Sequence, residues 1–293
     1  MLLPCLALVV PFLLVPALMT VHLSTTNMSL ATLGNTQFVG LDNYARLLER
    51  PELPRIAVNT VVFVVPNLVL FSLALPLAVA ALTTVWNRSV GRFARLLWLL
   101  PRLTPSVVYS LLWVWLTADA PFGTLNQLAE VIGLQPRNWL LEHPWLTIVA
   151  ADGLIGTSFA TVLFVAAMEA VPRELVMAAQ VDGASRWQLL LHVVLPYIRW
   201  PVLFVSAYQF LSLLASFELI LLLTNGGPGL WQTETWSLYA YHQAFSYYAG
   251  GLQIGYGAAI ATVLVLAGLV ASLLFLRLFD FRRLAGEPRL KVA

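Results

Sequence analysis

The chain has 293 residues, of which 60% are hydrophobic and only 10% are charged, and its formal net charge is +2. Soluble globular domains carry roughly 25% charged residues, so this composition excludes a soluble domain. The small positive charge gives no reason to expect nucleic-acid binding. The single cysteine, Cys5, excludes a disulfide framework and a thiolate metal cluster.

Long windows without Asp, Glu, Lys or Arg divide the chain. A helix needs about 20 apolar residues to cross about 30 Å of hydrocarbon. The sequence predicts six such helices, at 2–23, 58–84, 96–117, 147–170, 200–223 and 256–279. These windows are rich in Leu, Ala and Phe and do not alternate with period two, which favours helices over a transmembrane barrel. We therefore expect an all-α membrane protein.

The first apolar window allows two interpretations. A cleaved signal peptide would have a basic leader, whereas Met1 is followed directly by Leu2, and no small-x-small site precedes a soluble domain. We expect 1–23 to be a transmembrane helix and 24–57 to be an external segment. Within that segment, 38–48 predicts an amphipathic interfacial helix with Asp42 as a possible cap.

The basic residues predict the orientation of the chain. Eleven fall in the connections after the second, fourth and last spans, and four fall on the other side. Arg102 is near a span end, from which its side chain can snorkel. This distribution places both termini and the 171–199 loop in the cytoplasm, with a five-helix core at 58–284 and a cytoplasmic tail at 285–293.

Polar residues within the predicted spans indicate where a solute could pass. Prolines also interrupt the second and third spans, and each leaves a backbone carbonyl that a neighbouring group must satisfy. Such prolines occur in helices that line a pathway and equally in static helix bundles. Aromatic faces with amide or carboxylate partners suit hydroxyl-rich ligands, while Ser and Thr often bond their own or neighbouring helices. The candidates for the pathway are Asn67, Thr157, Tyr208, Gln209, Ser212 and Glu218.

Residues 171–196, VPRELVMAAQVDGASRWQLLLHVVLP, form a polar stretch between two apolar spans. Pro172 can start a helix, Gly183 can end it in a left-handed conformation, and Asp182 can bond local amides. A second helix is expected from Ala184 onward, with packing by Trp187, Leu190, Leu191, Val194 and Leu195. The stretch predicts a helix–glycine–helix knob that fits a socket on a partner. An amphipathic loop lying on lipid headgroups is the alternative.

This stretch resembles the coupling loop, or EAA loop, of the membrane subunits of binding-protein-dependent ATP-driven importers. That pattern is roughly E-A-A-x-x-x-D-G-A followed by a segment ending in Leu-Pro, and Met177 stands here at the first acidic position. Three weaker similarities occur in the family's order: FxGLxNY at 38–44, FGxxN at 122–126 and LTxGGP at 223–228. Together they resemble carbohydrate-type permeases, similar to the maltose and glycerol-3-phosphate systems, over nearly the whole chain.

The resemblance implies a type I ABC importer permease fold with six transmembrane helices in the cytoplasmic membrane. It implies alternating access for a sugar or sugar-like solute: an oligosaccharide, glycerol-3-phosphate or a polyol. The implied partners are a second homologous permease subunit, a dimer of ATP-binding subunits that carry ATP and Mg, and an external solute-binding protein. Contacts with the ATPase are expected from Leu175, Ala178, Ala179, Asp182, Gly183, Ala184, Trp187, Leu195 and Pro196.

The chain itself lacks the residues for ATP hydrolysis. A P-loop, G-x-x-x-x-G-K-[ST], requires a lysine, and Lys291 is the only lysine of the chain. Neither H-E-x-x-H nor G-x-S-x-G occurs, so we expect no metal site, no catalytic site and no cofactor bound by this chain. An ion-gradient-driven secondary transporter is the alternative, and it would predict inverted repeats and buried carboxylates. A third hypothesis, a scaffold or assembly protein without transport activity, does not explain the sequence pattern of residues 171–196.

Overall fold

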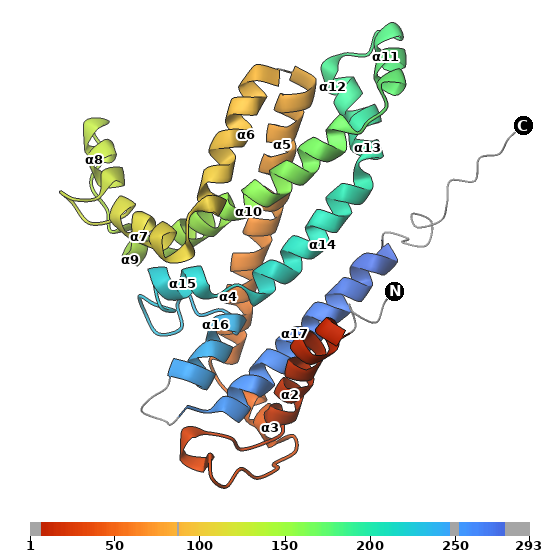
Figure 1. The fold of residues 1–293 in the computed structure, drawn as a ribbon. Coiled ribbons are helices and arrows are strands. Elements are labelled where there is room, and N and C mark those ends of the chain that lie inside the picture. Colours follow the sequence, from red (N-terminus) through yellow and green to blue (C-terminus); the bar gives the residue numbers. More distant parts are fainter. Residues whose placement is uncertain (1–6, 87, 247–251, 279–293) are drawn as a thin grey trace, which may run out of the picture. The chain divides into compact units, whose positions relative to one another are not determined.

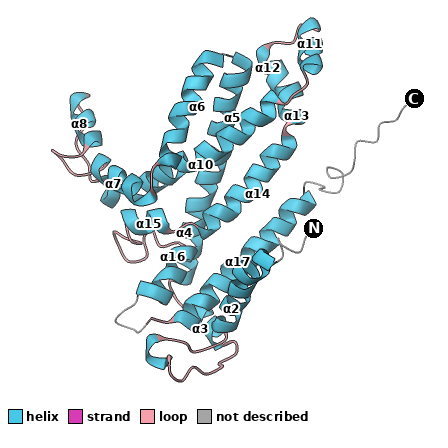
Figure 2. Ribbon diagram, in the orientation of Figure 1, coloured by secondary structure: helices cyan, strands magenta, loops and turns pink. Residues whose placement is uncertain are grey.

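The computed structural model describes residues 7–86, 88–246 and 252–278, and these residues are helical or in loops (Figures 1 and 2). The described part contains no strand beyond one isolated bridge between Thr26 and Phe38. The all-α class predicted from the sequence is therefore confirmed. Cys5 and the predicted tail at 285–293 lie outside the described residues.

Four helical stretches are long and apolar enough to cross a membrane, by length and composition: Ala7–Ser24, Leu53–Trp86, Pro144–Glu169 and Ile254–Phe275. Two helix pairs raise the number to six if each pair is one span. They are Leu96–Leu103 with Ser106–Leu116, bent by 107°, and Arg186–Tyr197 with Arg199–Ala215, bent by 67°. The single helices predicted at 96–117 and 200–223 are wrong. The first is broken between Leu103 and Ser106, and the second between Ala215 and Glu218.

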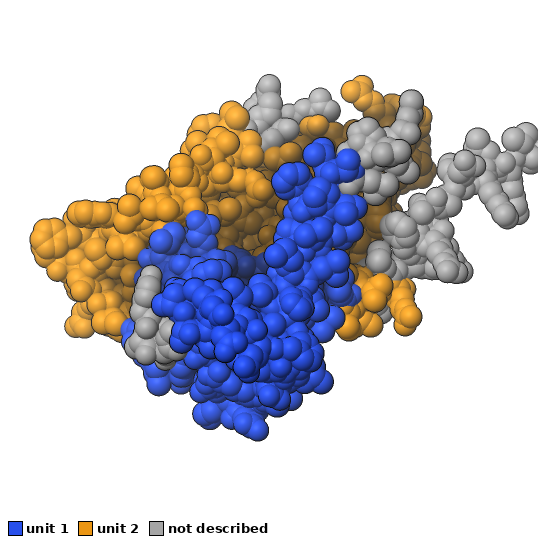
Figure 3. Space-filling model, turned by 60° about the horizontal axis from the view of Figure 1, so that its bottom comes forward, with its two compact units in different colours: residues 1–61, 214–269 blue, residues 62–213, 270–293 orange. Residues whose placement is uncertain are grey.

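Two compact units divide the chain (Figure 3). Unit 1 contains residues 1–61 and 214–269, and unit 2 contains residues 62–213 and 270–293. Three helices contribute residues to both units: α4 (Leu53–Pro66), α14 (Arg199–Ala215) and α17 (Ile254–Leu278). The division predicted at 23, 57 and 284 stays a prediction.

Unit 2 is built around the long helix α10 (Pro144–Glu169), which crosses α5 (Leu75–Ala81) and α6 (Arg88–Leu103) (Figure 1). The chain enters α5 from the π-helix η3 (Asn67–Ala74) and leaves it through η4 (Leu82–Trp86). A Cβ at Gly153 would collide with the ring of Phe71, so this glycine allows α10 to approach η3 closely. The remaining helices before α14 are α7 (Ser106–Leu116), α8 (Thr124–Val131), α9 (Trp139–Glu142), α11 (Arg173–Val181), α12 (Arg186–Leu189), η5 (Leu190–Val194) and α13 (Leu195–Tyr197).

Side chains of α10 satisfy backbone carbonyls of the neighbouring, proline-containing spans. The Thr157 hydroxyl donates to Phe71 O at 2.7 Å and to Gly153 O at 2.9 Å. Ser158 donates to the carbonyl of Trp98 in α6. These hydroxyls therefore link α10 to the two neighbouring spans.

Unit 1 contains the N-terminal helices η1 (Val10–Leu14) and α2 (Val15–Ser24), followed by η2 (Leu30–Thr32) and α3 (Asp42–Leu48). Its later helices are α15 (Glu218–Leu223), α16 (Trp236–Tyr241) and η6 (His242–Ser246). Its buried apolar cluster consists of Leu47, Ile56, Tyr239, Ala240, Tyr256 and Ile260.

The helix predicted within 38–48 is confirmed as α3, but the predicted cap is wrong. Asp42 is the first residue of α3, and the N-cap residue Leu41 makes no side-chain cap bond. The next residue, Asn43, is buried, and its Nδ2 donates to Ser24 O and Thr26 O at 2.8 Å each. This asparagine therefore joins α3 to the end of α2, where helix carbonyls lack partners.

Candidate functional site

The segment 171–196 folds as two short helices joined by a sharp turn, as predicted. At the end of α11, the N–H of Gly183 donates to Gln180 O at 3.1 Å and that of Ala184 donates to Ala179 O at 2.9 Å. This pair of bonds is a Schellman motif. Gly183 has a φ of +80°, and a Cβ there would meet no atom within 4 Å. The glycine is needed for its backbone angle and not for space.

A reciprocal capping box begins the second helix. Gln188 N–H donates to Ser185 Oγ at 3.3 Å, and Ser185 N–H donates to Gln188 Oε1 at 2.8 Å. The signal for this box is the S-x-x-Q spacing, which the sequence interpretation overlooked. Asp182 closes α11 through its backbone N–H, which donates to Ala178 O at 3.0 Å. The described residues show no bond to its carboxylate.

The second helix attaches the segment to the core of unit 2. Leu190 and Val194 are buried, as predicted, together with Leu189. Leu191 does not pack within the single chain, since it is 53% exposed. Trp187 is also mostly exposed, at 63%, although its ring meets that of Trp86 edge-on at a centroid distance of 4.9 Å. This ring contact connects α12 to η4 within unit 2.

The first helix of the segment, α11, has no buried residue. Its exposed large apolar side chains are Leu175, Met177 and Val181. We refer to these three and Trp187 as the knob side chains. Of the other residues predicted to contact a partner, Ala178, Asp182, Gly183 and Pro196 are exposed, while Ala179, Ala184 and Leu195 are half-buried. In Figure 1, α11 and α12 project together at one end of unit 2.

The polar residues predicted along a solute pathway fall into two groups. Gln209 is buried, and its Nε2 donates to Ser72 Oγ at 3.1 Å and to Gly156 O at 3.3 Å. Asn67 is buried and donates to Phe63 O at 2.9 Å. With Thr157, these side chains bond the protein itself. The second group, Tyr208, Ser212 and Glu218, is exposed.

Arg102, predicted near a span end, lies one residue before the end of α6. It sits just before the break between α6 and α7, and its Cζ is 5.2 Å from the ring centroid of Phe159 in α10. The Phe159 ring is 4.8 Å from that of Tyr208 in α14, which lies 6.3 Å from Phe204. We refer to these four residues as the cation–aromatic cluster. Sequence spacing gave no signal for it, because the contacts join three helices.

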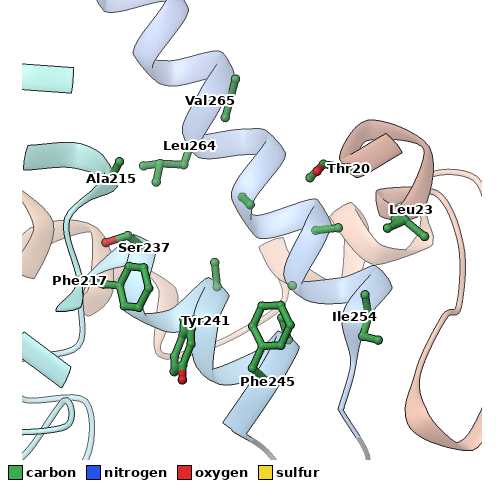
Figure 4. Close-up of a pocket in the computed structure, with 15 residues that line it drawn as sticks. Thr20, Leu23, Ala215, Phe217, Ser237, Tyr241, Phe245, Ile254, Leu264 and Val265 are labelled. Carbon is green, nitrogen blue, oxygen red and sulfur yellow. The ribbon is translucent and has the colours of Figure 1, made fainter. Parts of the chain in front are cut away.

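A hollow of about 440 Å³ lies within unit 1 (Figure 4). Phe217 and Tyr241 stack at 4.9 Å along one side, and Phe245 follows Tyr241 at 5.7 Å. The polar side chains at its lining are those of Thr20, Ser237 and Tyr241. The hydroxyls of Thr20 and Ser237 already donate to Pro16 O and Ser216 O. Few groups are thus left to bind a hydroxyl-rich ligand.

The LTxGGP loop after α15 is closed by an acid–imidazole network whose carboxylate is buried. Glu234 Oε1 lies 2.8 Å from His242 Nδ1, and His242 Nε2 lies 3.0 Å from Asn225 Oδ1. Gly226 has a φ of +82°, and a Cβ there would collide with the Glu234 carboxylate. Burial raises the pKa of Glu234 above its ordinary value, although the bond from His242 acts in the opposite direction. The glycine makes room for the carboxylate.

The FGxxN stretch shapes its loop by the same kind of contacts. A Cβ at Gly123 would collide with Ala118 O. The buried Asn126 Nδ2 donates to Ala118 O and Arg137 O at 2.9 Å each, and its Oδ1 accepts from Trp139 Nε1 at 3.1 Å. These motif residues therefore organise the loop around α8.

Known proteins similar to this chain are membrane components of transport systems. The model of the family "Binding-protein-dependent transport system inner membrane component" matches residues 72–284. The trehalose/maltose transport system permease protein MalF of Thermococcus litoralis is 32% identical over 97% of this chain and 93% of its own length. The trehalose transport system permease protein SugA of Mycobacterium tuberculosis is 31% identical over 91% of this chain and 83% of its own.

A solved structure shares the fold. The crystal structure of a bacterial ABC transporter involved in the import of the acidic polysaccharide alginate contains a chain that matches with a TM-score of 0.79. The match covers 97% of this chain and 94% of that chain, at 23% sequence identity.

Proposed function

This chain belongs to the binding-protein-dependent transport system inner membrane component family and is a permease of a carbohydrate-uptake ABC importer. On that basis we propose the following function for each of its parts. The helices form the path of a sugar or sugar-like solute: an oligosaccharide, glycerol-3-phosphate or a polyol. The path alternates between inward- and outward-open packings, and differential binding of ATPase subunits to the two packings drives the change.

The observation that carries this proposal is the exposed segment 171–196. Its Schellman turn and capping box set the angle between two short helices. The knob side chains remain exposed on them, while Leu190 and Val194 fix the base of the segment in the core of unit 2. A rigid base and an exposed apolar tip are what a coupling element needs in order to pass a partner's motion to the helices.

The proposal includes three kinds of partner. A dimer of ATP-binding subunits binds the knob and carries ATP and Mg, a second homologous permease subunit completes the path, and an external solute-binding protein delivers the solute. The eleven-to-four distribution of basic residues supports a cytoplasmic position for the knob and both termini. The names of the relatives support a sugar as the solute. The comparisons give no support to an ion-gradient-driven transporter.

The experiment replaces Gly183 with Val in the complete complex. Valine disfavours a φ of +80°, so the turn between α11 and α12 should open and the knob should lose its shape. We expect the complex to lose ATP-dependent uptake of labelled trehalose, maltose, glycerol-3-phosphate and sorbitol in proteoliposomes, whichever of these the wild type accepts.

Gly133→Val is the matched control. Gly133 has a φ of +78°, and a Cβ there also meets open space, but it lies after α8. This variant should retain uptake. Unchanged uptake by Gly183→Val, with the ATPase still copurifying, would contradict the role of the segment. A wild-type chain that copurifies with no ATPase would contradict the proposed function as a whole.

A further inference from the structure

The cation–aromatic cluster places a positive charge deep in the transmembrane region. Phe159 lies 15 residues after the start of α10 and 10 residues before its end. At a rise of 1.5 Å per residue, its backbone is about 22 Å and about 15 Å from the two ends. A hydrocarbon layer about 30 Å thick therefore contains this position when α10 crosses it. The guanidinium of Arg102, 5.2 Å from the Phe159 ring, lies at the same depth.

No carboxylate neutralises this charge within the described part of the chain. Arg102 makes no ion pair at 4.0 Å or less with the described residues. Its described partner is the face of an aromatic ring, which attracts a cation without cancelling its charge. The guanidinium keeps its five N–H donors for other groups.

An arginine at this depth does not face lipid. Ionisable side chains in transmembrane segments almost always point to the bundle interior or to a water-filled cavity, because hydrocarbon cannot solvate them. The Arg102 side chain is nevertheless exposed in the single chain, as is Tyr208 beside Phe159. In the assembled transporter, the exposed side of the cluster borders either the second permease subunit or an aqueous space at membrane depth. In a permease, that space is the path of the solute.

The chemistry of the cluster selects a particular kind of solute. The rings of Phe159 and Tyr208, 4.8 Å apart, offer apolar faces to the C–H face of a sugar ring. A guanidinium binds carboxylate, phosphate or sulfonate oxygens through two parallel N–H bonds, which a neutral hydroxyl cannot match. Gln209 and Thr157, by contrast, are occupied by bonds to the protein. Arg102 is thus the group best able to distinguish solutes by charge.

We propose that Arg102 is a specificity-determining residue that binds an anionic group of the solute, so that the substrate class is an acidic sugar or sugar phosphate. Phe159 and Tyr208 hold the ring of that solute beside the guanidinium. This inference rests on the proposed function as a permease. It assigns the charge of the solute, which the function alone leaves open.

The test measures equilibrium binding to the purified complete complex without its solute-binding protein, so that the selectivity of that protein does not enter. The probes are two matched pairs, mannobiose with dimannuronate and trehalose with trehalose 6-phosphate. Wild type should bind at least one anionic member more tightly than its neutral counterpart. Arg102→Gln should weaken that anionic member by about tenfold or more, as expected for one charge-assisted contact. It should change the neutral member less than twofold.

Two further variants separate charge from stacking. Arg102→Lys keeps the charge but loses the planar fork, so the affinity for the anionic probe should fall between those of wild type and Arg102→Gln. Tyr208→Leu removes a ring face and should weaken both members of a pair by the same factor.

Four outcomes would overturn the proposal: a wild type that favours the neutral members, a wild type that binds no probe, equal effects of Arg102→Gln on both members, or loss of the second permease from the Arg102→Gln complex. The last outcome would assign Arg102 to an ion pair with that subunit. In each of them copurification of the ATPase with wild type would still support the permease function, so the two failures are distinguishable.

Discussion

Two loops of this chain contain a glycine at nearly the same positive φ shortly after a helix, yet their surroundings are opposite. Gly183 in the coupling segment has a φ of +80° and open space around it. Gly226 in the LTxGGP loop has a φ of +82° and lies against the buried carboxylate of Glu234. Sequence resemblance identified both glycines equally well. The structure shows that one keeps a surface free, while the other leaves room for an internal network.

The difference separates a motif that leaves its side chains exposed from a motif that stabilises its own chain. Both glycines meet the same backbone requirement. Around Gly183, the apolar side chains of Met177 and Val181 remain exposed, whereas around Gly226 the polar atoms of Glu234, His242 and Asn225 bond one another. Substitutions should therefore affect stability in the second loop and transport in the first.

The largest expected effect is that of Gly226→Ala. The new methyl group combines an unfavourable φ with overlap of a carboxylate that is fixed by His242. Backbone strain and overpacking each cost about 1–3 kcal/mol, so the detergent-solubilised protein should melt well below wild type. If the melting temperature stayed within one or two degrees of wild type, the Glu234 carboxylate would have moved aside at little cost. Gly226 and Gly183 would then no longer differ in how well they accept a side chain.

Gly183→Ala should have a smaller effect on stability. Only the left-handed conformation opposes alanine here, at a cost of about 1–2 kcal/mol, because a Cβ meets no atom within 4 Å. Thermal melting of this variant beside Gly226→Ala measures the difference directly. Gly183→Asn is the matched control and should recover part of the loss, since asparagine tolerates this conformation. Equal melting temperatures for the two alanine variants would contradict the claim that the surroundings of Gly226 restrict a side chain more than those of Gly183.

Ser185→Ala should cost about 1 kcal/mol by removing the N-cap of α12. The loss should appear as faster hydrogen exchange at Gln188 and its neighbours, with little change in the LTxGGP loop. Ser185→Asp is the control, because aspartate caps as well as serine. If the alanine variant exchanged like wild type, the capping box would not set the start of this helix.

The smallest effect expected is a pH dependence from Glu234. Because burial raises its pKa, the folded protein keeps a proton at pH values where the unfolded chain has lost it. Stability should therefore decrease as pH rises from the ordinary glutamate range, near 4.5, through the raised pKa. Glu234→Gln cannot titrate and should flatten this part of the melting curve. A wild-type melting temperature that rises with pH relative to Glu234→Gln would reverse the assigned direction.

Local features of the sequence were predictable because their causes are local. Charge-free windows indicate apolar helices wherever they occur, and the left-handed turn at Gly183 depends on backbone bonds between residues up to five positions apart. The capping box at 185–188 was also recognisable from its S-x-x-Q spacing, although it was not predicted. Pro172 was expected to start the first helix, and it is the N-cap residue one position before α11 begins at Arg173. The class, the main helices and the shape of the coupling segment thus follow from residues near one another in the chain.

Pairings between distant residues were decided only by the tertiary structure. Gln209 bonds Ser72, 137 positions away, so a residue chosen for the solute became a contact between helices. Arg102 meets Phe159 only because α6 packs against α10, and these helices are distant in the sequence. Single-chain periodicity tells which residues can be buried, but not which of them meet, since helix packing fixes that choice after each helix has formed.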